Sequence, residues 1–167
     1  MRRSDRAREM SGHWDAGEII QGLFVGSLRA ALDVDQLHSH NVYHVLTAAE
    51  RLDLSSLPST ISRRQINIAD HPCEDLFADL TEPLQYIDNA LSQGGCLVHC
   101  ASGVSRSVSI CCVWLMIRKG MTFTDAIDLT RAVRCLASPN VGFKAQLLAL
   151  VSFSFAHIIL SIMYCHA

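Results

Sequence analysis

Short apolar runs alternate along this chain with longer segments in which apolar residues recur every three or four positions. The short runs are mostly β-branched and predict buried strands at 23–26, 42–47, 64–68 and 96–99. The longer segments predict helices at 30–39, 75–91, 108–117 and 123–134, and a last helix from 140 onward. This alternation favours an α/β fold, in which helices flank a central, mostly parallel sheet.

Local signals indicate where several of these helices begin and end. Pro83 falls inside one helical pattern, so we expect that helix to be kinked or to restart near Thr81. Gly120 is expected to end the helix that precedes it. Thr122 and Asp125, three positions apart, indicate a capping box at the start of the next helix.

The composition is that of one compact domain with two unlike ends. Half of the 167 residues are hydrophobic, which is enough for a single core. We expect residues 17–150 to form this domain. Residues 1–16 are rich in arginine and lack an apolar stretch, which predicts a disordered arm instead of a secretory signal.

Residues 151–167 form an apolar tail without any Asp, Glu, Lys or Arg. The tail contains serine and histidine and is short for a membrane span. Packing on the domain or self-association is therefore the favoured interpretation. A membrane anchor stays open as the alternative.

Charge and cysteine usage narrow the class of protein. The net charge is −2, and no basic stripe follows the N-terminal arm, so nucleic-acid binding is not expected. Seven cysteines without a secretory feature favour a reduced setting, the cytoplasm or the nucleus. There is no Cys-x2-Cys pair, and His44 lies inside a predicted strand, where it cannot easily converge with His38 and His40. We therefore expect neither a metal nor a cofactor.

The strongest chemical signal lies between the last predicted strand and the apolar helix that follows. Cys100 precedes Arg106 by six positions, with Gly103 between them. A short strand-to-helix loop turns several backbone N–H groups inward and makes a concave anion site. Arg106 adds a planar cation that can bind two phosphate oxygens, and Cys100 at the floor would be stabilised as a thiolate. The loop therefore predicts transfer of a phosphoryl group to sulfur.

These residues also resemble a known family. The run from 99 to 107, His-Cys-Ala-Ser-Gly-Val-Ser-Arg-Ser, resembles the signature of the protein tyrosine phosphatase superfamily, above all its small dual-specificity branch. Similar segments recur outside the loop, so that the resemblance covers about residues 17–150, at positions 22–27, 42–49, 66–70 and 134–147. Ser102 and Cys135 depart from the family's common Ala and Pro, but neither change removes a chemical group. The resemblance implies a phosphatase-like α/β fold with a phosphate-binding loop between a strand and a helix.

The loop chemistry and the resemblance together assign roles. Cys100 is the expected nucleophile, and Arg106 is expected to bind phosphate and stabilise the transition state. Ser107 is expected to donate a hydrogen bond to the sulfur and so help the thiolate leave. The phosphate-binding loop comprises Ala101, Ser102, Gly103, Val104, Ser105 and Arg106. His99 should point away from Cys100, either as a buried hydrogen-bonding support for the loop or as an ordinary core residue.

A general acid must protonate the oxygen that leaves phosphorus, and four upstream carboxylates are candidates: Asp70, Glu74, Asp75 and Asp79. Asp75 and Asp79 are expected at a helix start, where capping and solvation explain them. Asp70 opens the loop after a predicted strand, and the resemblance also implies an acid on this loop. We therefore expect Asp70 to be the acid. The resemblance implies that Asn140 braces the phosphate loop, and an ordinary helix cap is the alternative.

The loop composition narrows the substrate class by comparison with the superfamily. Its phosphoinositide phosphatases tend to carry lysines inside the loop, and its RNA 5′-triphosphatases have Thr-Gly after the arginine. This chain has neither feature. The resemblance thus implies a phosphoprotein substrate, and the short chain implies a shallow pocket that admits phosphotyrosine, phosphoserine and phosphothreonine. A catalytically weak phospho-binding or kinase-scaffolding module, which would use the same loop, stays open as the alternative.

Overall fold

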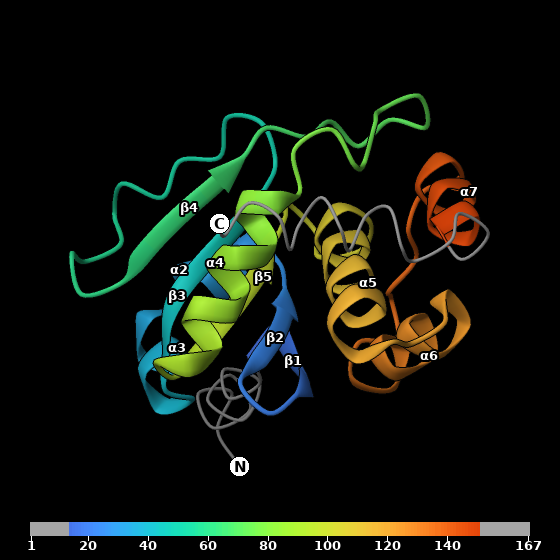
Figure 1. The fold of residues 1–167 in the computed structure, drawn as a ribbon. Helices are drawn as coiled ribbons and strands as arrows, with labels where there is room; N and C mark the ends of the chain where they lie inside the picture. Colours follow the sequence, from blue (N-terminus) through green and yellow to red (C-terminus); the bar gives the residue numbers. More distant parts are fainter. Residues whose placement is uncertain (1–13, 151–167) are drawn as a thin grey trace, which may run out of the picture.

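The computed structural model describes residues 14–150 and arranges them as one sheet with helices on both faces (Figure 1). In chain order the elements are β1 (Ala16–Ile20), β2 (Leu23–Gly26), α2 (Leu28–Leu32), α3 (Val34–Ser39), β3 (Val42–Ala48), β4 (Ser62–Ile66), α4 (Thr81–Ser92), β5 (Gly95–His99), α5 (Arg106–Lys119), α6 (Phe123–Val133) and α7 (Val141–Leu150). The predicted α/β class is confirmed.

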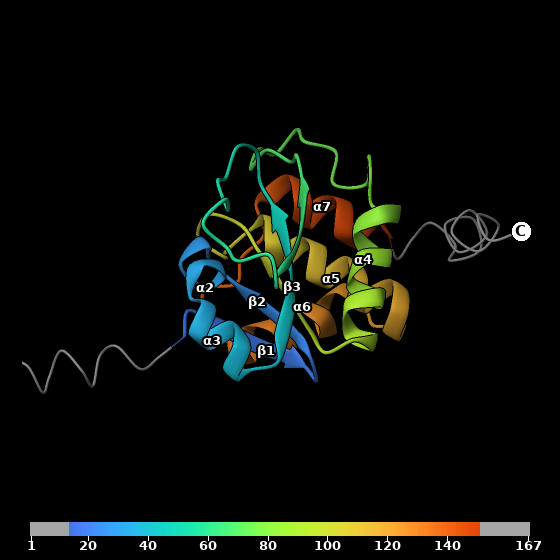
Figure 2. The same cartoon turned by 90° about the vertical axis from the view of Figure 1, so that its left-hand side faces the viewer.

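The strand order in the sheet is β1-β2-β5-β3-β4. β2, β5, β3 and β4 are parallel to one another, and β1 pairs antiparallel with β2. Parallel neighbours require crossover connections: α2 and α3 connect β2 to β3, and α4 connects β4 to β5, whereas a loop without a helix, residues 49–61, connects β3 to β4. Figure 2 shows α2 and α3 on one side of the sheet and α4 and α5 on the other. This is the mostly parallel, helix-flanked sheet that the sequence predicts.

Two apolar clusters hold the layers together. On β5, Cys96 and Val98 face the larger cluster under α4, α5, α6 and α7, whereas Leu97 faces the smaller cluster under α2 and α3. This alternation follows from the two-residue period of a strand. On α5, every residue from Ser107 to Met116 is buried. The end of β5 and the start of α5 are thus both fixed by the core.

The three central strands end at the same edge of the sheet. In the strand register His99 lies opposite Gly26 of β2 and Thr47 of β3. The carboxyl ends of parallel strands are the usual position of a functional site in this kind of fold. The segment that follows His99 therefore leaves the sheet at the edge where chemistry is expected.

The helix predicted at 30–39 is in fact two helices. The side chain of Asp33 lies between α2 and α3 and accepts a hydrogen bond from the N–H of Gln36 at 3.2 Å. Asp33 therefore caps α3. Its carboxylate interrupts the single helix predicted at 30–39, because a local hydrogen bond to the backbone competes with continuous helical hydrogen bonding.

The strand predicted at 64–68 begins two residues earlier, and its side chains are mostly exposed. The prediction of a buried strand is wrong because β4 is an edge strand, paired with β3 on one side. Edge strands can expose polar side chains that central strands cannot.

The helix predicted at 75–91 begins at Thr81, the restart that Pro83 indicated. Pro83 lies in the first turn, where a missing N–H costs no helical hydrogen bond. Residues 75–80 are not helical: they form irregular turns from which Leu76 and Leu80 reach the core. Their helical spacing thus reflects burial from a loop, and the expectation that Asp75 and Asp79 start a helix is wrong.

The predicted helix end at Gly120 and the capping role of Thr122 are confirmed, although the Asp125 carboxylate accepts the Thr122 hydroxyl instead of completing a capping box at the Thr122 N–H. Gly120 has a left-handed conformation, with φ 66°, after the last residue of α5. Such a conformation favours glycine because it has no Cβ. The hydroxyl of Thr122 accepts the N–H of Asp125 at 3.1 Å and so caps α6.

β1 is a strand that the apolar pattern does not predict. The segment just before it is also part of the fold: Trp14 is 6% exposed, stacks on His40 and donates a hydrogen bond to the carbonyl of Ala30 at 3.0 Å. The folded domain therefore includes residues 14–16, which the sequence assigns to the arm. The rest of the arm and the apolar tail 151–167 lie outside the described residues. Within 14–150, no helix combines the length and the apolar character that crossing a membrane requires.

Candidate active site

Residues 100–105, called the Cys100 loop from here on, connect β5 to α5. Each carbonyl oxygen of this loop accepts a hydrogen bond. The donors are His99 Nδ1 to Cys100 (3.1 Å), Leu28 N to Ala101 (3.1 Å), Arg134 Nη2 to Ser102 (2.8 Å), Arg134 Nε to Gly103 (2.6 Å), Ser138 N to Val104 (2.8 Å) and Ser109 N to Ser105 (2.8 Å). In a trans peptide the N–H points opposite to the carbonyl, so the N–H groups of the loop are directed to its concave side. Converging N–H groups form a site for an anion.

The sulfur of Cys100 lies on this concave side, where several hydrogen-bond donors surround it. The N–H of Gly103 is 3.2 Å and the hydroxyl of Ser107 is 3.3 Å from Sγ. Burial by itself raises the pKa of the Cys100 thiol. Hydrogen bonds from the Ser107 hydroxyl and from the N–H groups of Ser107, Gly103 and Val104 outweigh burial and hold the pKa below its ordinary value. The site therefore favours a thiolate.

Arg106 begins α5 and has a side chain that is only 14% exposed. Within the described residues its Nε has no hydrogen-bond partner and lies 3.7 Å from Oδ2 of Asp70. Its Nη1 is 3.5 Å from the carbonyl oxygen of Ile68. A buried donor without an acceptor costs free energy. An oxyanion on the concave side of the loop would be an acceptor for this guanidinium, whose Nε has none within the described residues.

Gly103 is required by the conformation of the loop. Its φ is +68°, a region that other residues rarely adopt. A Cβ at this position would also overlap the carbonyl of Gly26 and would lie 2.8 Å from Nη2 of Arg134. The loop can therefore pack against the end of β2 only with glycine here.

His99 is fully buried and hydrogen-bonded through both ring nitrogens. Nδ1 lies 3.1 Å from the carbonyl of Cys100, and Nε2 lies 2.8 Å from the hydroxyl of Thr47. A carbonyl only accepts, so Nδ1 carries the proton and Nε2 accepts from Thr47. Burial lowers the pKa of His99 to about 4, although the Cys100 carbonyl partly opposes this effect. The neutral imidazole therefore connects β3 to the Cys100 loop.

Asp70 lies against the loop, between Ser105 and Asn140. Its Oδ1 accepts the hydroxyl of Ser105 at 2.7 Å and the side-chain amide of Asn140 at 2.9 Å. Oδ2 faces Nε of Arg106. The sequence left two roles open for Asn140, a brace for the phosphate loop and a helix cap. The structure shows the cap as well, because Oδ1 of Asn140 accepts the N–H of Phe143 in α7 at 2.9 Å. Its backbone N–H donates to Oγ of Ser105 at 3.0 Å.

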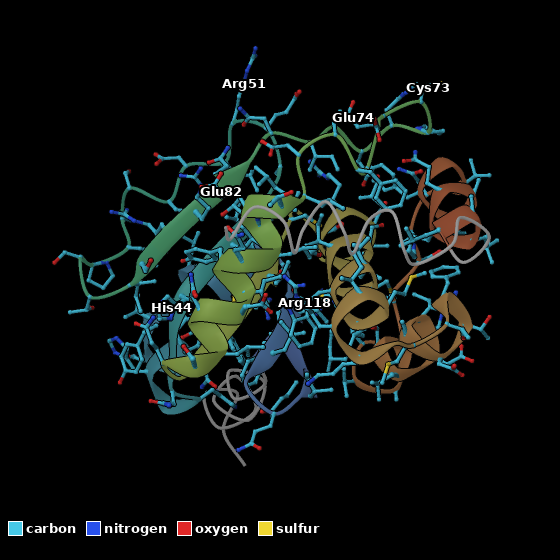
Figure 3. All side chains as sticks on the ribbon, in the orientation of Figure 1. His44, Arg51, Cys73, Glu74, Glu82 and Arg118 are labelled. Atoms are coloured by element: carbon cyan, nitrogen blue, oxygen red, sulfur yellow. The ribbon has the colours of Figure 1, made fainter. Side chains whose placement is uncertain are left out.

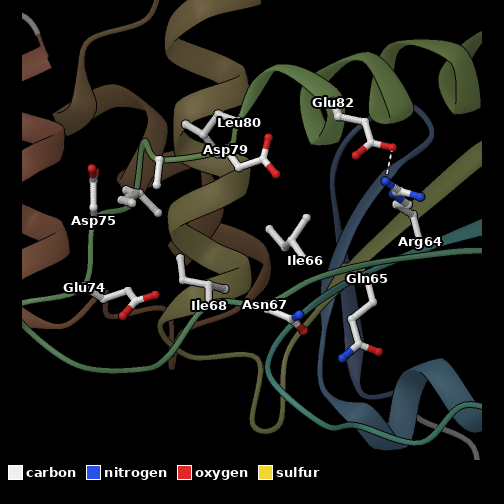
Figure 4. Close-up of a pocket in the computed structure, with 12 residues that line it drawn as sticks. Arg64, Gln65, Ile66, Asn67, Ile68, Glu74, Asp75, Asp79, Leu80 and Glu82 are labelled. Carbon is white, nitrogen blue, oxygen red and sulfur yellow. Dashed lines mark ion pairs between the residues drawn. The ribbon is translucent and has the colours of Figure 1, made fainter.

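The other three acid candidates lie elsewhere. Glu74, Asp75 and Asp79 line a separate cavity of about 230 Å³ between β4 and the segment that leads to α4 (Figure 4). None of the residues 100–107 lines this cavity. Of the four carboxylates, Asp70 is thus the one whose hydrogen bonds reach the Cys100 loop.

Arg134 is the main residue of the site that the sequence did not identify. Its guanidinium donates to two loop carbonyls and, through Nη1, to the carbonyl and carboxylate of Asp15 at 3.0 and 3.1 Å. Asp15 also accepts the hydroxyl of Ser27. The buried guanidinium of Arg134 therefore connects the Cys100 loop to Asp15, the residue just before β1. The only signal in the sequence is an arginine at the end of an amphipathic helix, which usually means a solvated residue.

Among residues 14–150, no three His, Cys, Asp or Glu side chains are grouped so that they could hold a metal ion. The six cysteines described, Cys100 included, are free thiols. The chemistry that the site offers is therefore that of one thiol, one guanidinium and one carboxyl around an anion site.

Comparison with known families agrees with this geometry. A family model described as the dual specificity phosphatase catalytic domain matches residues 23–152. Dual specificity protein phosphatase 1B of Arabidopsis thaliana is 42% identical over 139 residues, which are 83% of this chain and 83% of that protein. Human dual specificity protein phosphatase 22 is 35% identical over 133 residues, covering 78% of this chain and 70% of that protein.

Solved structures show the same fold. The structure of DUSP15 has a TM-score of 0.82 at 27% identity and covers 93% of this chain and 99% of its own. The structure of human DUSP28 has a TM-score of 0.75 at 30% identity, covering 80% and 90%.

Proposed function

This chain belongs to the dual specificity phosphatase family, and from that premise we propose that Cys100, Arg106 and Asp70 carry out its catalysis through a phosphocysteine intermediate. The chain is a dual specificity protein phosphatase. One observation supports the residue roles most directly: a hydrogen-bonded thiol, a buried guanidinium N–H that has no acceptor among residues 14–150 and the Asp70 carboxyl all meet at the Cys100 loop.

In the first step, the phosphate of the substrate binds the loop N–H groups and Arg106. The thiolate of Cys100 attacks phosphorus, and the bond to the oxygen of the substrate side chain breaks. That oxygen takes a proton from Asp70 as it leaves. Oδ2 is the oxygen left for this task, since Oδ1 already accepts two hydrogen bonds. The product of this step is phosphocysteine with an ionised Asp70.

In the second step, water attacks phosphorus and the sulfur leaves as a thiolate. The Asp70 carboxylate takes the proton of the water, which returns the acid to its starting form. The hydroxyl of Ser107 and the N–H of Gly103 stabilise the departing thiolate through the contacts already described. Arg106 stabilises the charge on the transferring phosphoryl group in both steps.

The proposed substrates are proteins phosphorylated on tyrosine, serine or threonine, and phosphorylated protein kinases are one class of them. The names of several relatives support the phosphoprotein class. The chain spans 34% of dual specificity protein phosphatase MPK-4 of Drosophila melanogaster, so its whole-protein properties do not transfer. The free thiols in the described residues agree with a cytoplasmic or nuclear setting.

The test is hydrolysis of a small aryl phosphate between about pH 4.5 and about pH 8.5. The wild type should give a bell-shaped profile with an optimum nearer to about pH 6 than about pH 8, because thiolate and protonated acid must coexist. Cys100→Ser and Arg106→Ala should be inactive. Asp70→Asn should lose roughly 10²-fold or more of the hydrolysis rate, and its pH profile should lack the decrease on the alkaline side.

Asp79→Asn is the matched control, because that carboxylate lines the separate cavity. It should keep the wild-type profile. A reduced wild-type protein that is inert at every pH would contradict the proposal and favour the phospho-binding or scaffolding module. An unchanged alkaline limb in Asp70→Asn would remove Asp70 from its role.

A further inference from the structure

The segment from His71 to Asp79 follows the acid Asp70 and has no regular secondary structure. Most of its hydrogen bonds are internal, such as those from Glu74 N to the His71 carbonyl and from Phe77 N to Asp75. Within the described residues, only two hydrogen bonds connect this segment to another element, and both come from the side chain of Gln146.

Gln146 lies on α7, and both the oxygen and the nitrogen of its side-chain amide bind the segment. Oε1 accepts the N–H of Leu76 at 2.8 Å, and Nε2 donates to the carbonyl of Glu74 at 2.7 Å. One side chain thus accepts one hydrogen bond from the backbone of the segment and donates another to it, as a neighbouring strand would. Figure 3 shows Cys73 and Glu74 on the loop that reaches over toward α7.

A second contact comes from one turn earlier on the same helix. A Cβ at position 142 would overlap the carbonyl group of Pro72, so glycine lets the loop lie directly on α7. Residues 142 and 146 are four positions apart and therefore share a face of the helix. Just before α7, Asn140 holds Asp70 itself.

The opposite side of the segment is only partly supported: Leu76 packs in the core and Phe77 lies against it. Glu74, Leu76 and Asp79 border the cavity of about 230 Å³ described above (Figure 4). A backbone that faces a cavity on one side gains its position from the other side. The hydrogen bonds and the close contact with α7 therefore contribute to the position of residues 71–79 and, through the chain, to that of Asp70.

We propose that Gln146 is a positioning residue for the general acid: it fixes the segment after Asp70 on α7, with Gly142 providing the close approach. This inference rests on the proposed function, since it needs Asp70 as the acid. Loss of the two Gln146 hydrogen bonds should impair only the protonation of the leaving oxygen. The effect should therefore depend on the leaving group, which a general loss of folding would not.

The experiment measures kcat/KM, which reports phosphocysteine formation, for aryl phosphates whose phenols range from strongly to weakly acidic. Gln146→Met keeps the length of the side chain but removes both hydrogen bonds. It should reduce kcat/KM about tenfold or more for the weakly acidic phenol, because misplaced catalytic groups cost this order of rate. For the strongly acidic phenol, which leaves without a proton, the change should stay below about threefold. Gly142→Ala should give the same pattern.

Two further variants make the result decisive. Gln93→Met changes an exposed glutamine at the end of α4 and should match the wild type with every substrate. Asp70→Asn should show the leaving-group dependence in its strongest form. The positioning role would be overturned if Gln146→Met and Gly142→Ala reduced kcat/KM equally for both aryl phosphates, or did not reduce it at all. The proposed function would still stand in that case, provided that Asp70→Asn shows the leaving-group dependence. If Asp70→Asn itself shows no such dependence, the role of Asp70 fails and the positioning role fails with it.

Discussion

At Cys100, burial and hydrogen bonding act on the thiol in opposite directions, and hydrogen bonding prevails. Burial raises the pKa of Cys112 to about 12 and also raises that of Cys111, whereas the pKa of Cys100 is lowered. The difference lies in the donors that reach the Cys100 sulfur. A hydrogen bond to an ionised group contributes roughly 1.5–3 kcal/mol, so a few of them offset the desolvation of one thiolate.

Ser107→Ala tests this balance at a single atom. Removal of the hydroxyl 3.3 Å from Sγ should raise the pKa of the thiol toward its ordinary value. The rate of alkylation of Cys100 by iodoacetamide, followed against pH, should then reach its midpoint at a higher pH. Because the same hydroxyl stabilises the departing thiolate, kcat should also fall roughly tenfold.

Ser109→Ala is the control, since that buried hydroxyl donates to the carbonyl of Ser105 and not to sulfur. Its alkylation midpoint should match that of the wild type. An unchanged midpoint in Ser107→Ala would show that the backbone N–H groups suffice for the thiolate.

At the scale of elements, the Cys100 loop takes its shape from parts of the chain that are far apart in sequence. β5, the loop and α5 are contiguous, so their order and the positions of Cys100, Arg106 and Ser107 could be predicted from the sequence. The contacts of Arg134 could not, because Gly103 is 31 and Asp15 is 119 positions away. Contacts at such separations depend on how the helices pack, which local patterns do not encode.

The same distinction explains the errors in the fold. Residues 23–26 were predictable because a buried central strand is a continuous apolar run. β1 and β4 lie at the two edges of the sheet and carry polar residues, so their apolar patterns are weak. Periodicity also misassigned 75–80, because it detects burial and not backbone conformation.

Arg134→Lys tests how the elements hold the loop. Lysine keeps the charge near Asp15, but a single ammonium group cannot replace the guanidinium bonds to Ser102 and Gly103. Carbonyls without their donors should let the loop N–H groups turn away from the anion. We expect the inhibition constant of orthovanadate, a phosphate analogue, to rise about tenfold.

Arg118→Lys provides the comparison, since Arg118 pairs with Asp88 near the other end of α5. Its orthovanadate inhibition should equal that of the wild type. Wild-type inhibition in Arg134→Lys would mean that the loop keeps its shape without the guanidinium.

At the scale of the whole molecule, the site and the core share the buried His99. The imidazole joins β3 to the Cys100 loop in its neutral form, and its pKa of about 4 lies below that of an exposed histidine, about 6.5. Between these two pH values the unfolded chain binds a proton that the folded protein does not. His99 therefore lowers the stability of the fold as pH decreases through this window.

His99→Gln should remove this part of the pH dependence. Between about pH 7 and about pH 5, the free energy of unfolding of the wild type should decrease by about 2 kcal/mol more than that of the variant. Urea unfolding at both pH values measures the difference. Equal decreases in the two proteins would indicate that His99 is not held neutral by the fold.

The whole account depends on the transfer of phosphate to one sulfur atom, and that event can be observed directly. The wild type is mixed with an aryl phosphate, quenched in acid during turnover and digested, and its peptides are analysed by mass spectrometry. We predict one phosphoryl group on the peptide that contains Cys100, located at Cys100, and none in Cys100→Ser. Turnover without phosphate on Cys100, or with phosphate on another residue, would contradict the mechanism.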